Sequence, residues 1–481
     1  MREIENKKYI SWPVLAFMAF STVIGFDDLI YNFKNQGLGV ITSWIILLSL
    51  YMIPYSLMVG QLGSTFNKEG GGLSSWLRGT KGDAWGYFTA WTYWAAMVPY
   101  VVESANAVVV GIGWMINGDN SLADQLTTSK FALLTFVVFV IFVFIQLKVK
   151  NLLEILGTIG GAAMFIMCIL FIVMALASLM MPGTKMATQP MELRTFVPKF
   201  NLHYLTTVAL LIYAINGSEL VAPYVTRMKK PAKEFPKAMI FLTIMAAVLT
   251  IFGSFSLGIF FDANNLPHDL KMNGSYYAFL ALGERYGLGK ILMYLYALIS
   301  VTYMSALLAV LLDAMTRMLI SDTGEKYMPK ALLKKNERGL PVNGYLLTAG
   351  LSAFILILPI FGLKNINLIF DWLLQLNGII SPFVTCWIFY AFMQIRKNSQ
   401  KYKAEYIFIK NDKIAYLIGF WCLAITFAAS IFGMIPQGNP STFEWKYTLA
   451  INILAPTVLI GLGGVMPWLA SRERKKEQTN L

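Results

Sequence analysis

Apolar segments recur along the whole chain, and they constrain its fold more than any other feature. Each is long enough to supply the ~20 helical residues that cross the hydrocarbon core of a bilayer. Only 14% of the residues are charged, whereas soluble domains carry about a quarter. We therefore predict an all-α polytopic membrane protein with twelve transmembrane helices. The predicted spans cover residues 13–33, 38–63, 84–117, 131–147, 152–182, 201–226, 238–261, 288–320, 341–363, 365–395, 414–436 and 446–470.

The lysine and arginine residues are distributed unevenly between the segments that join these spans. If the N-terminus is cytoplasmic, 29 of the 39 basic residues fall on the cytoplasmic side. Such a bias sets the orientation of membrane proteins. It predicts a multi-pass protein of the cytoplasmic membrane with both termini in the cytoplasm. The net charge of +13 then reflects topology, and we do not expect a nucleic-acid partner.

Residues typical of enzyme and metal sites are sparse. The three cysteines, Cys168, Cys386 and Cys422, lie within apolar runs, and the two histidines, His203 and His268, are far apart in the sequence. We find no nucleotide-binding loop, metal motif or nucleophile motif. The sequence therefore predicts no enzyme, no catalytic residue, no metal site and no cofactor.

Two of the spans contain residues that weaken a helix. The first holds Gly25 followed by Phe26, Asp27 and Asp28, and the sixth holds the run 216–218, Asn-Gly-Ser. Glycine lowers helix propensity, and Asn and Ser compete for backbone hydrogen bonds. Unwound backbone at membrane depth is tolerated only where it faces protein or a water-filled cavity. We therefore predict that both spans are interrupted beside a cavity.

The two interrupted spans are five spans apart. This spacing is expected if spans 1–5 and 6–10 form two inverted repeats, in which paired broken helices mark a binding site near the midplane. The predicted organisation is one transporter domain. Its first repeat covers residues 1–182 and its second 201–395, followed by the last two spans at 414–470 and a cytoplasmic tail at 471–481.

Three stretches carry a resemblance to a known family. They are "VIGFDDLI" in the first span, "GQLGSTFNKEGGGLSSWLRGTKGDAWGYFTAWTYW" after the second, and "YAINGSELVAPYVTRMKKPAKEFPKAM" in and after the sixth. Together they resemble the amino acid–polyamine–organocation superfamily of secondary transporters. The resemblance implies a core of ten helices in two inverted repeats (the LeuT-like fold), two further helices, alternating access, and relatives among bacterial amino acid permeases and exchangers.

The chain departs from this family pattern at the first break. Many relatives have small residues there, whose backbone N–H groups hold a substrate carboxylate, but this chain has Phe26, Asp27 and Asp28. Either the acids point elsewhere or the ligand is positively charged. The residues predicted to bind substrate are Ile24, Gly25, Phe26, Asp27, Asp28, Tyr100, Glu103, Tyr213, Asn216, Gly217 and Ser218.

Acidic residues inside predicted spans are unfavourable, because each charge near the bilayer centre costs about 2.5–3.5 kcal/mol on insertion scales. We expect at least one of Asp27 and Asp28 to line a wet pathway, and we assign proton coupling or gating to Asp28 and Glu219. Glu219 also suits the N-terminus of a second half-helix. Asp313 and Asp371 are expected to be structural, the first paired with a basic neighbour and the second solvated.

These features predict a secondary active transporter of cationic amino acids or of their amine products, such as polyamines. A proton-coupled permease for neutral amino acids is an alternative, and antiport and symport are not distinguished. A second alternative is a non-transporting sensor or scaffold with the same fold. The expected partners are a small-molecule substrate, protons and the lipid bilayer, and the oligomeric state is left open.

Overall fold

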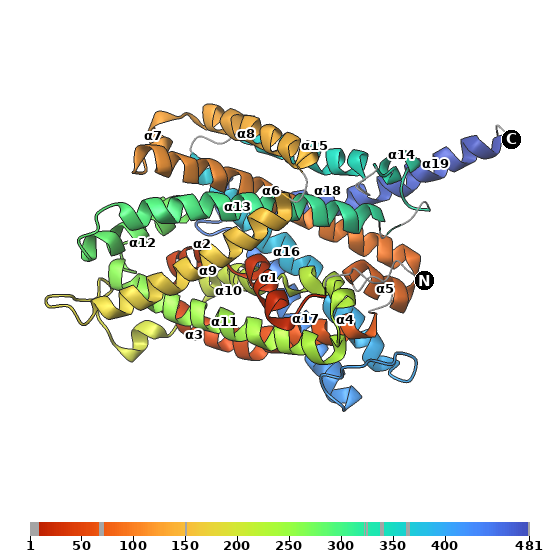
Figure 1. Ribbon diagram of the computed structural model, residues 1–481, viewed down its shortest axis with the longest axis horizontal. Coiled ribbons are helices and arrows are strands. Elements are labelled where there is room, and N and C mark those ends of the chain that lie inside the picture. The colour runs from red at the N-terminus through yellow and green to blue at the C-terminus, as the bar shows by residue number, and fades with distance from the viewer. Residues whose placement is uncertain are drawn as a thin grey trace.

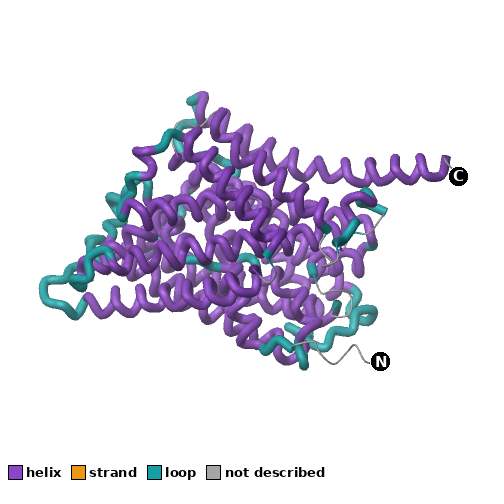
Figure 2. The backbone as a smooth tube through the Cα atoms, turned by 45° about the horizontal axis from the view of Figure 1, so that its top comes forward, coloured by secondary structure: helices purple, strands orange, loops and turns teal. Residues whose placement is uncertain are grey.

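The computed structural model describes residues 9–66, 72–149, 152–321, 323, 326–336, 341–361 and 366–479. Within these ranges the regular secondary structure is helical throughout (Figure 2). Many of the long helices run side by side between two ends where the loops gather (Figures 1 and 2). One end holds α5 (Leu73–Lys81), α14 (Lys330–Leu333) and α19 (Val465–Thr479), and we call it the α19 end. The opposite end holds α7 (Leu122–Gln125) and α12 (Leu270–Arg285), and we call it the α12 end.

The described part contains eleven helical stretches that are long and apolar enough to cross a membrane. The prediction of a polytopic, all-helical membrane protein is therefore confirmed. The stretches are Phe26–Thr65, Asp83–Asn117, Thr128–Lys148, Gly160–Ser178, Leu202–Ala222, Lys233–Phe260, Ile291–Ile320, Val342–Ile360, Ile366–Lys397, Asp412–Gly433 and Trp445–Thr479.

The count of eleven, where the sequence predicts twelve, has its cause in the first predicted span. This span is divided into α1 (Trp12–Val23) and α2 (Phe26–Gln36), which have 12 and 11 residues and are each too short to cross alone. Beyond α2 the chain stays helical and forms the stretch that ends at Thr65. The elements that follow α2 are η1 (Gly37–Gly39), α3 (Val40–Leu47), the π-helical turn η2 (Leu48–Met52) and α4 (Ile53–Thr65).

The remaining elements follow the predicted segments closely. They are α6 (Asp83–Asn117), α8 (Thr128–Lys148), α9 (Leu152–Ser178), η3 (Leu193–Phe196), α10 (Leu202–Ile215), η4 (Ser218–Arg227), α11 (Pro231–Phe260), α13 (Ile291–Ser321), α15 (Val342–Ile357), η5 (Leu358–Phe361), α16 (Ile366–Lys397), α17 (Asp412–Gly433), α18 (Phe443–Gly461) and η6 (Leu462–Gly464). The last predicted span continues through η6 into α19, which projects beyond the rest of the molecule (Figure 1).

The two interrupted spans lie against each other. α1 packs against η4, and α2 packs against α10, so each half of one span meets one half of the other. The sixth span is broken between α10 and η4, where Asn216 and Gly217 leave the helix. The predicted interruptions of the first and sixth spans are thus observed, and packing brings them together.

The short helix α12 is not one of the candidate membrane spans, and it lies directly on α2. At Gly274, an added Cβ would lie 2.6 Å from Cγ2 of Ile30, which is closer than real Cβ contacts come. Only glycine permits this approach. The close packing places the neighbouring residues of α12 beside the first break.

Candidate substrate site

The first break explains why two acids lie inside an apolar run. Ile24 and Gly25 are extended, with φ of −137° and −108°, and α2 begins at Phe26. Asp27 and Asp28 therefore occupy the first turn of a half-helix, where the helix dipole stabilises negative charge. The Asp28 carboxylate also accepts a hydrogen bond of 2.8 Å from the backbone N–H of Gly25. The acids are thus placed by the interruption itself.

Asp27 connects the first break to two other elements. Its carboxylate accepts hydrogen bonds from the hydroxyl groups of Ser275 on α12 and Tyr296 on α13, the second at 3.4 Å. Ser275 is only 2% exposed and Tyr296 is fully buried, so these bonds are shielded from water. Asp27 therefore fixes α2 to α12 and α13.

At the second break, too, the backbone leaves the helix and an acid binds the N–H of a glycine. Asn216 is extended, and Gly217 has φ of +117°, a conformation that side chains with a Cβ rarely adopt. The N–H of Gly217 donates to the Glu219 carboxylate at 3.2 Å and to the Tyr55 hydroxyl at 3.1 Å. Tyr55 and Tyr93 both donate to Glu219, the latter at 2.6 Å. The Glu219 carboxylate, 4% exposed, is therefore held by groups from α4, α6 and its own turn.

Asn216 joins the second break to two further helices. Its side-chain oxygen accepts a 2.7 Å hydrogen bond from Tyr51 in η2, and its side-chain nitrogen donates to Thr385 on α16 at 3.1 Å. All three side chains are buried. Buried polar groups are expected to be paired in this way, because an unpaired one costs about 1–3 kcal/mol.

The two breaks share a local arrangement. In each, a carboxylate two or three residues after a glycine accepts a hydrogen bond from that glycine's own N–H, Asp28 with Gly25 and Glu219 with Gly217. Half-helix N-termini of this kind bind anionic substrate groups in transporters with broken helices. Here the chain's own carboxylates occupy both positions.

The third acid, Glu103 on α6, lies 6% exposed and accepts a 2.5 Å hydrogen bond from Asn377 on α16. The two predicted site tyrosines of this region, Tyr100 and Tyr213, contact each other edge to face, with ring centroids 5.8 Å apart. Asp28 and Glu103 are near enough to interact electrostatically. The residues predicted on the first, third and sixth spans are thus neighbours.

Two buried amide oxygens of this region, Asn32 Oδ1 and Asn377 Oδ1, have no hydrogen-bond partner among the described residues. Asn32 lies one turn after Asp28 on α2 and donates to the backbone oxygen of Asp28 at 2.8 Å. Unsatisfied acceptors are uncommon in protein interiors. The Asn377 side chain, which donates to Glu103, thus also carries an acceptor without a described partner.

The structure places the side chains of the predicted site residues in different surroundings. The side chain of Phe26 packs against Phe171, Phe279 and Tyr296, with ring centroids 4.9, 5.1 and 5.8 Å away, so it belongs to the apolar core. Its direction follows from the helix that starts at this residue. Ile24 is likewise buried at 1% exposure, although its backbone is part of the break.

Five other predicted residues retain partial exposure deep in the helix bundle, whereas most of their chain neighbours are buried. They are Gly25, Asp27, Asp28, Tyr100 and Tyr213. Asn216, Gly217 and Ser218 are buried at the second break.

Several residues that hold the site were not predicted. They are Tyr51, Tyr55, Ser275, Tyr296, Asn377 and Thr385. In addition, Asp371, expected to be solvated, forms an ion pair with Lys271. The pairing expected for Asp313 involves a side chain outside the described residues.

A separate hydrogen-bonded cluster around Asp269 lies at the α12 end, outside the membrane-spanning segments. Burial raises the pKa of Asp269, but hydrogen bonds from Tyr277, Asn273 and Asn120 outweigh it, and the pKa is lowered overall. The bond from Tyr277 measures 2.6 Å. The Asp269 carboxylate is therefore charged at neutral pH and hydrogen-bonded to its neighbours.

Comparison with known proteins assigns the chain to a family. A family model described as "Amino acid permease" matches residues 10–456, which is nearly the whole chain. The chain belongs to the amino acid permease family. This confirms the resemblance to the amino acid–polyamine–organocation superfamily and agrees with a transporter rather than an enzyme.

Three relatives show how the similarity within the amino acid permease family is distributed. The aspartate/glutamate permease AcaP of Lactococcus lactis subsp. cremoris is 40% identical over 477 residues, covering 98% of this chain and 97% of that protein. The inner membrane transporter YjeM of Escherichia coli is 22% identical over 92% of both chains. The probable agmatine/putrescine antiporter AguD of Lactococcus lactis subsp. lactis is 27% identical over 46% of both chains.

Proposed function

We propose that this permease is a secondary active transporter of acidic amino acids, aspartate and glutamate, that works by alternating access. The observation that carries this proposal is the 40% identity to an aspartate/glutamate permease across almost the whole length of both chains. The relative that handles amines covers less than half of the chain at 27% identity. The cationic substrate expected from Asp27 and Asp28 therefore gives way to an acidic one.

The geometry of the acids supports this change of substrate class. Asp27 accepts hydrogen bonds from Ser275 and Tyr296, and Asp28 caps its own half-helix, so both carboxylates already have partners within the protein. A cationic ligand would share these carboxylates with the partners that they already have. The first of the two readings left open by the sequence, in which the acids serve the protein rather than the ligand, fits these contacts better.

The arrangement at the breaks also provides a coupling mechanism. A substrate carboxylate would compete with Asp28 for the N–H of Gly25, and with Glu219 for the N–H of Gly217. Protonation of either resident acid weakens its hold on the N–H, since charge-assisted hydrogen bonds are roughly twice as strong as neutral ones. A proton and an acidic substrate would then bind together, and this assigns proton coupling to Asp28 and Glu219.

We also propose how the spans are organised and oriented in the membrane. Spans one to five and six to ten form two inverted repeats whose broken members, α1–α2 and α10–η4, pack against each other. The bias of basic residues supports an arrangement with the α19 end in the cytoplasm and the α12 end outside. The partially exposed residues Gly25, Asp27, Asp28, Tyr100 and Tyr213 would line the central substrate space.

Uptake by the purified permease in liposomes tests the proposal. Radiolabelled L-glutamate would be supplied outside, with an excess of unlabelled aspartate, leucine, arginine or putrescine as competitor. We expect aspartate alone to abolish uptake of the label. Uptake of labelled arginine or putrescine, with none of glutamate, would restore the cationic assignment, and uptake of labelled leucine alone would favour a neutral amino acid permease.

A further inference from the structure

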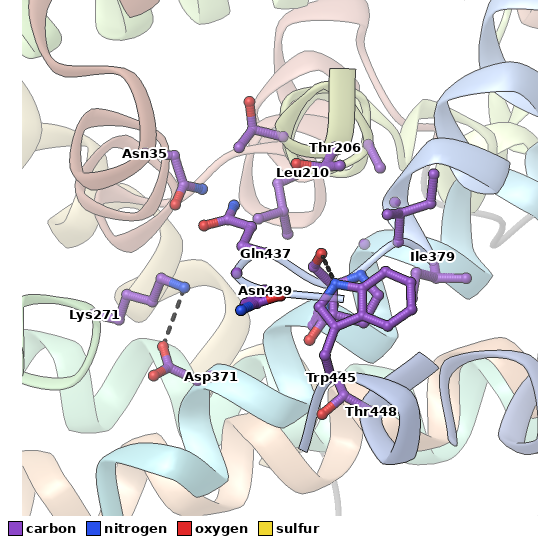
Figure 3. A pocket seen from close by; sticks show the side chains of 18 of the residues that line it. Asn35, Thr206, Leu210, Lys271, Asp371, Ile379, Gln437, Asn439, Trp445 and Thr448 are labelled. Atoms are coloured by element: carbon purple, nitrogen blue, oxygen red, sulfur yellow. Dashed lines mark hydrogen bonds and ion pairs between the residues drawn. The ribbon is translucent and has the colours of Figure 1, made fainter. Parts of the chain in front are cut away.

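A cavity of about 480 Å³ opens between the second half of the first span and the first half of the sixth (Figure 3). It is lined by residues of α2, α10, α12, α16 and α17, by the loop from Ile435 to Thr442, and by α18. Its volume falls within the range of small-molecule sites, roughly 300–1,000 Å³. The cavity is distinct from the breaks described above, because none of the residues predicted to bind substrate lines it.

The charged residues of this cavity form one ion pair. Lys271 on α12 and Asp371 on α16 lie 3.1 Å apart, with side-chain exposures of 19% and 40% (Figure 3). The neighbouring Lys34 on α2 donates to the backbone oxygen of His268, a neutral acceptor. The Asp269 carboxylate accepts hydrogen bonds from Tyr277 and Asn273. The ion pair with Asp371 is thus the described contact that holds the Lys271 ammonium group.

The cavity connects to the central acids through α16. Its wall includes Gly378, where an added Cβ would lie 2.6 Å from Cδ2 of Leu210, so α16 and α10 touch there. The preceding residue, Asn377, donates to Glu103. Asp371 precedes Asn377 by six residues, or about 9 Å along the helix axis. The ion pair therefore lies about two turns from a central acid.

The helix α12 provides a second connection. Lys271 and Ser275 are four residues apart and share a helix face. Lys271 binds Asp371 on α16, and Ser275 binds Asp27 at the first break. A ligand that draws Lys271 away from Asp371 would act on the same helix that holds the first break.

We infer that this cavity is an outer binding site for the side-chain carboxylate of an acidic amino acid, with Lys271 as its anion-binding residue. Asp371 is the internal competitor: its carboxylate occupies Lys271 until the substrate carboxylate takes its place. This inference rests on the proposed function. It adds a site that the substrate occupies before it reaches the breaks, and a residue that determines preference for acidic over neutral substrates.

The test uses two variants with opposite expected effects. Lys271→Met removes the ammonium group, and we expect the KM for glutamate uptake from outside to rise about tenfold. Asp371→Asn removes the competitor, and we expect the same KM to fall several-fold. Lys290→Met, at an exposed lysine of the α12 end that does not line the cavity, is the matched control and should leave KM unchanged. Lys271→Arg should restore most of the wild-type KM.

The outcomes below distinguish a substrate-binding cavity from a purely structural ion pair. If Lys271→Met and Asp371→Asn both raise KM or both lower the maximal rate, the pair is only a strut between α12 and α16, and the inference is wrong. If both variants match wild type, the cavity does not bind substrate. If a variant does not fold, Thr448→Cys in an otherwise wild-type chain decides, with the rate of its modification by a thiol reagent measured with and without glutamate. Protection by glutamate supports the site, and its absence refutes the site. Failure of the proposed function looks different, because the wild type itself would then transport no acidic amino acid.

Discussion

At the scale of single residues, the intramembrane acids are explained by the interruptions beside them. Asp28 and Glu219 each satisfy the N–H of a nearby glycine, and Asp27 is held by Ser275. These contacts remove much of the cost of placing carboxylates among apolar residues. They also create a competition between protein and substrate carboxylates for the same N–H groups.

Asp28→Asn tests that competition directly. An amide side chain stays neutral at every pH, so substrate binding should no longer require a proton. We expect glutamate binding by wild type to weaken as pH rises, by at most about tenfold per pH unit for one bound proton, and binding by the variant to depend less on pH. Equilibrium binding between pH 5 and 8 measures the difference. Asp119→Asn, in an exposed loop, is the control, and the same slope in all three proteins would contradict the coupling role.

Gly217 is the residue whose backbone most requires glycine. Its φ of +117° disfavours any side chain, so Gly217→Ala should cost about 1–2 kcal/mol or shift the local backbone. A shift would misplace the N–H that Tyr55 and Glu219 share, and we expect uptake to fall strongly. Gly183→Ala is the matched control, because Gly183 also has positive φ, +79°, and has open space around it. Equal uptake by the two variants, at equal expression, would show that the backbone at Gly217 has no special role.

At the scale of elements, the short helix α12 links the outer cavity to the first break. It packs on α2 at Gly274, binds Asp27 through Ser275 and binds Asp371 through Lys271. The sequence does not single this helix out, because it lies between two predicted spans and is not a span itself. Its position shows that the segment between spans seven and eight contributes to the site.

Ser275→Ala tests how firmly α12 is held. Removing the hydroxyl leaves the Asp27 carboxylate with a single long hydrogen bond from Tyr296, and we expect a loss of about 1–3 kcal/mol in stability. Thermal unfolding in detergent measures it. Ser256→Ala is the control, because the buried Ser256 hydroxyl has no hydrogen-bond partner among the described residues and its loss should be neutral. A melting temperature equal to wild type in both variants would refute the link.

The interrupted spans and the partners of their acids show which parts of the site the sequence could predict. Glycine beside polar residues in an apolar run is a local signal, so the interruptions at Gly25 and Gly217 could be predicted. The partners of the acids could not, because Tyr55, Ser275 and Asn377 lie 164, 248 and 274 residues from Glu219, Asp27 and Glu103. A single sequence does not specify such contacts. Phe26, predicted to bind substrate as part of the first break, has its side chain packed against Phe171 in the apolar core, a contact that the sequence does not indicate.

At the scale of the whole molecule, the breaks and the outer cavity lie in series along the first, sixth and tenth spans. Asn377 on α16 binds a central acid, while Asp371 on the same helix lines the cavity at the α12 end. In an alternating-access cycle, substrate would enter from this end, displace resident carboxylates at the breaks and leave at the α19 end. This direction rests on the orientation that we propose from the distribution of basic residues.

The most direct measurement for this account is a cryo-EM structure of the permease with L-glutamate bound. We predict substrate density between the ends of α1 and α10, with a carboxylate on the N–H of Gly25 or Gly217 and the amino group near Glu103 and Asn377. Density elsewhere in the membrane region, with Asp28 and Glu219 still bound to the glycine N–H groups, would contradict it.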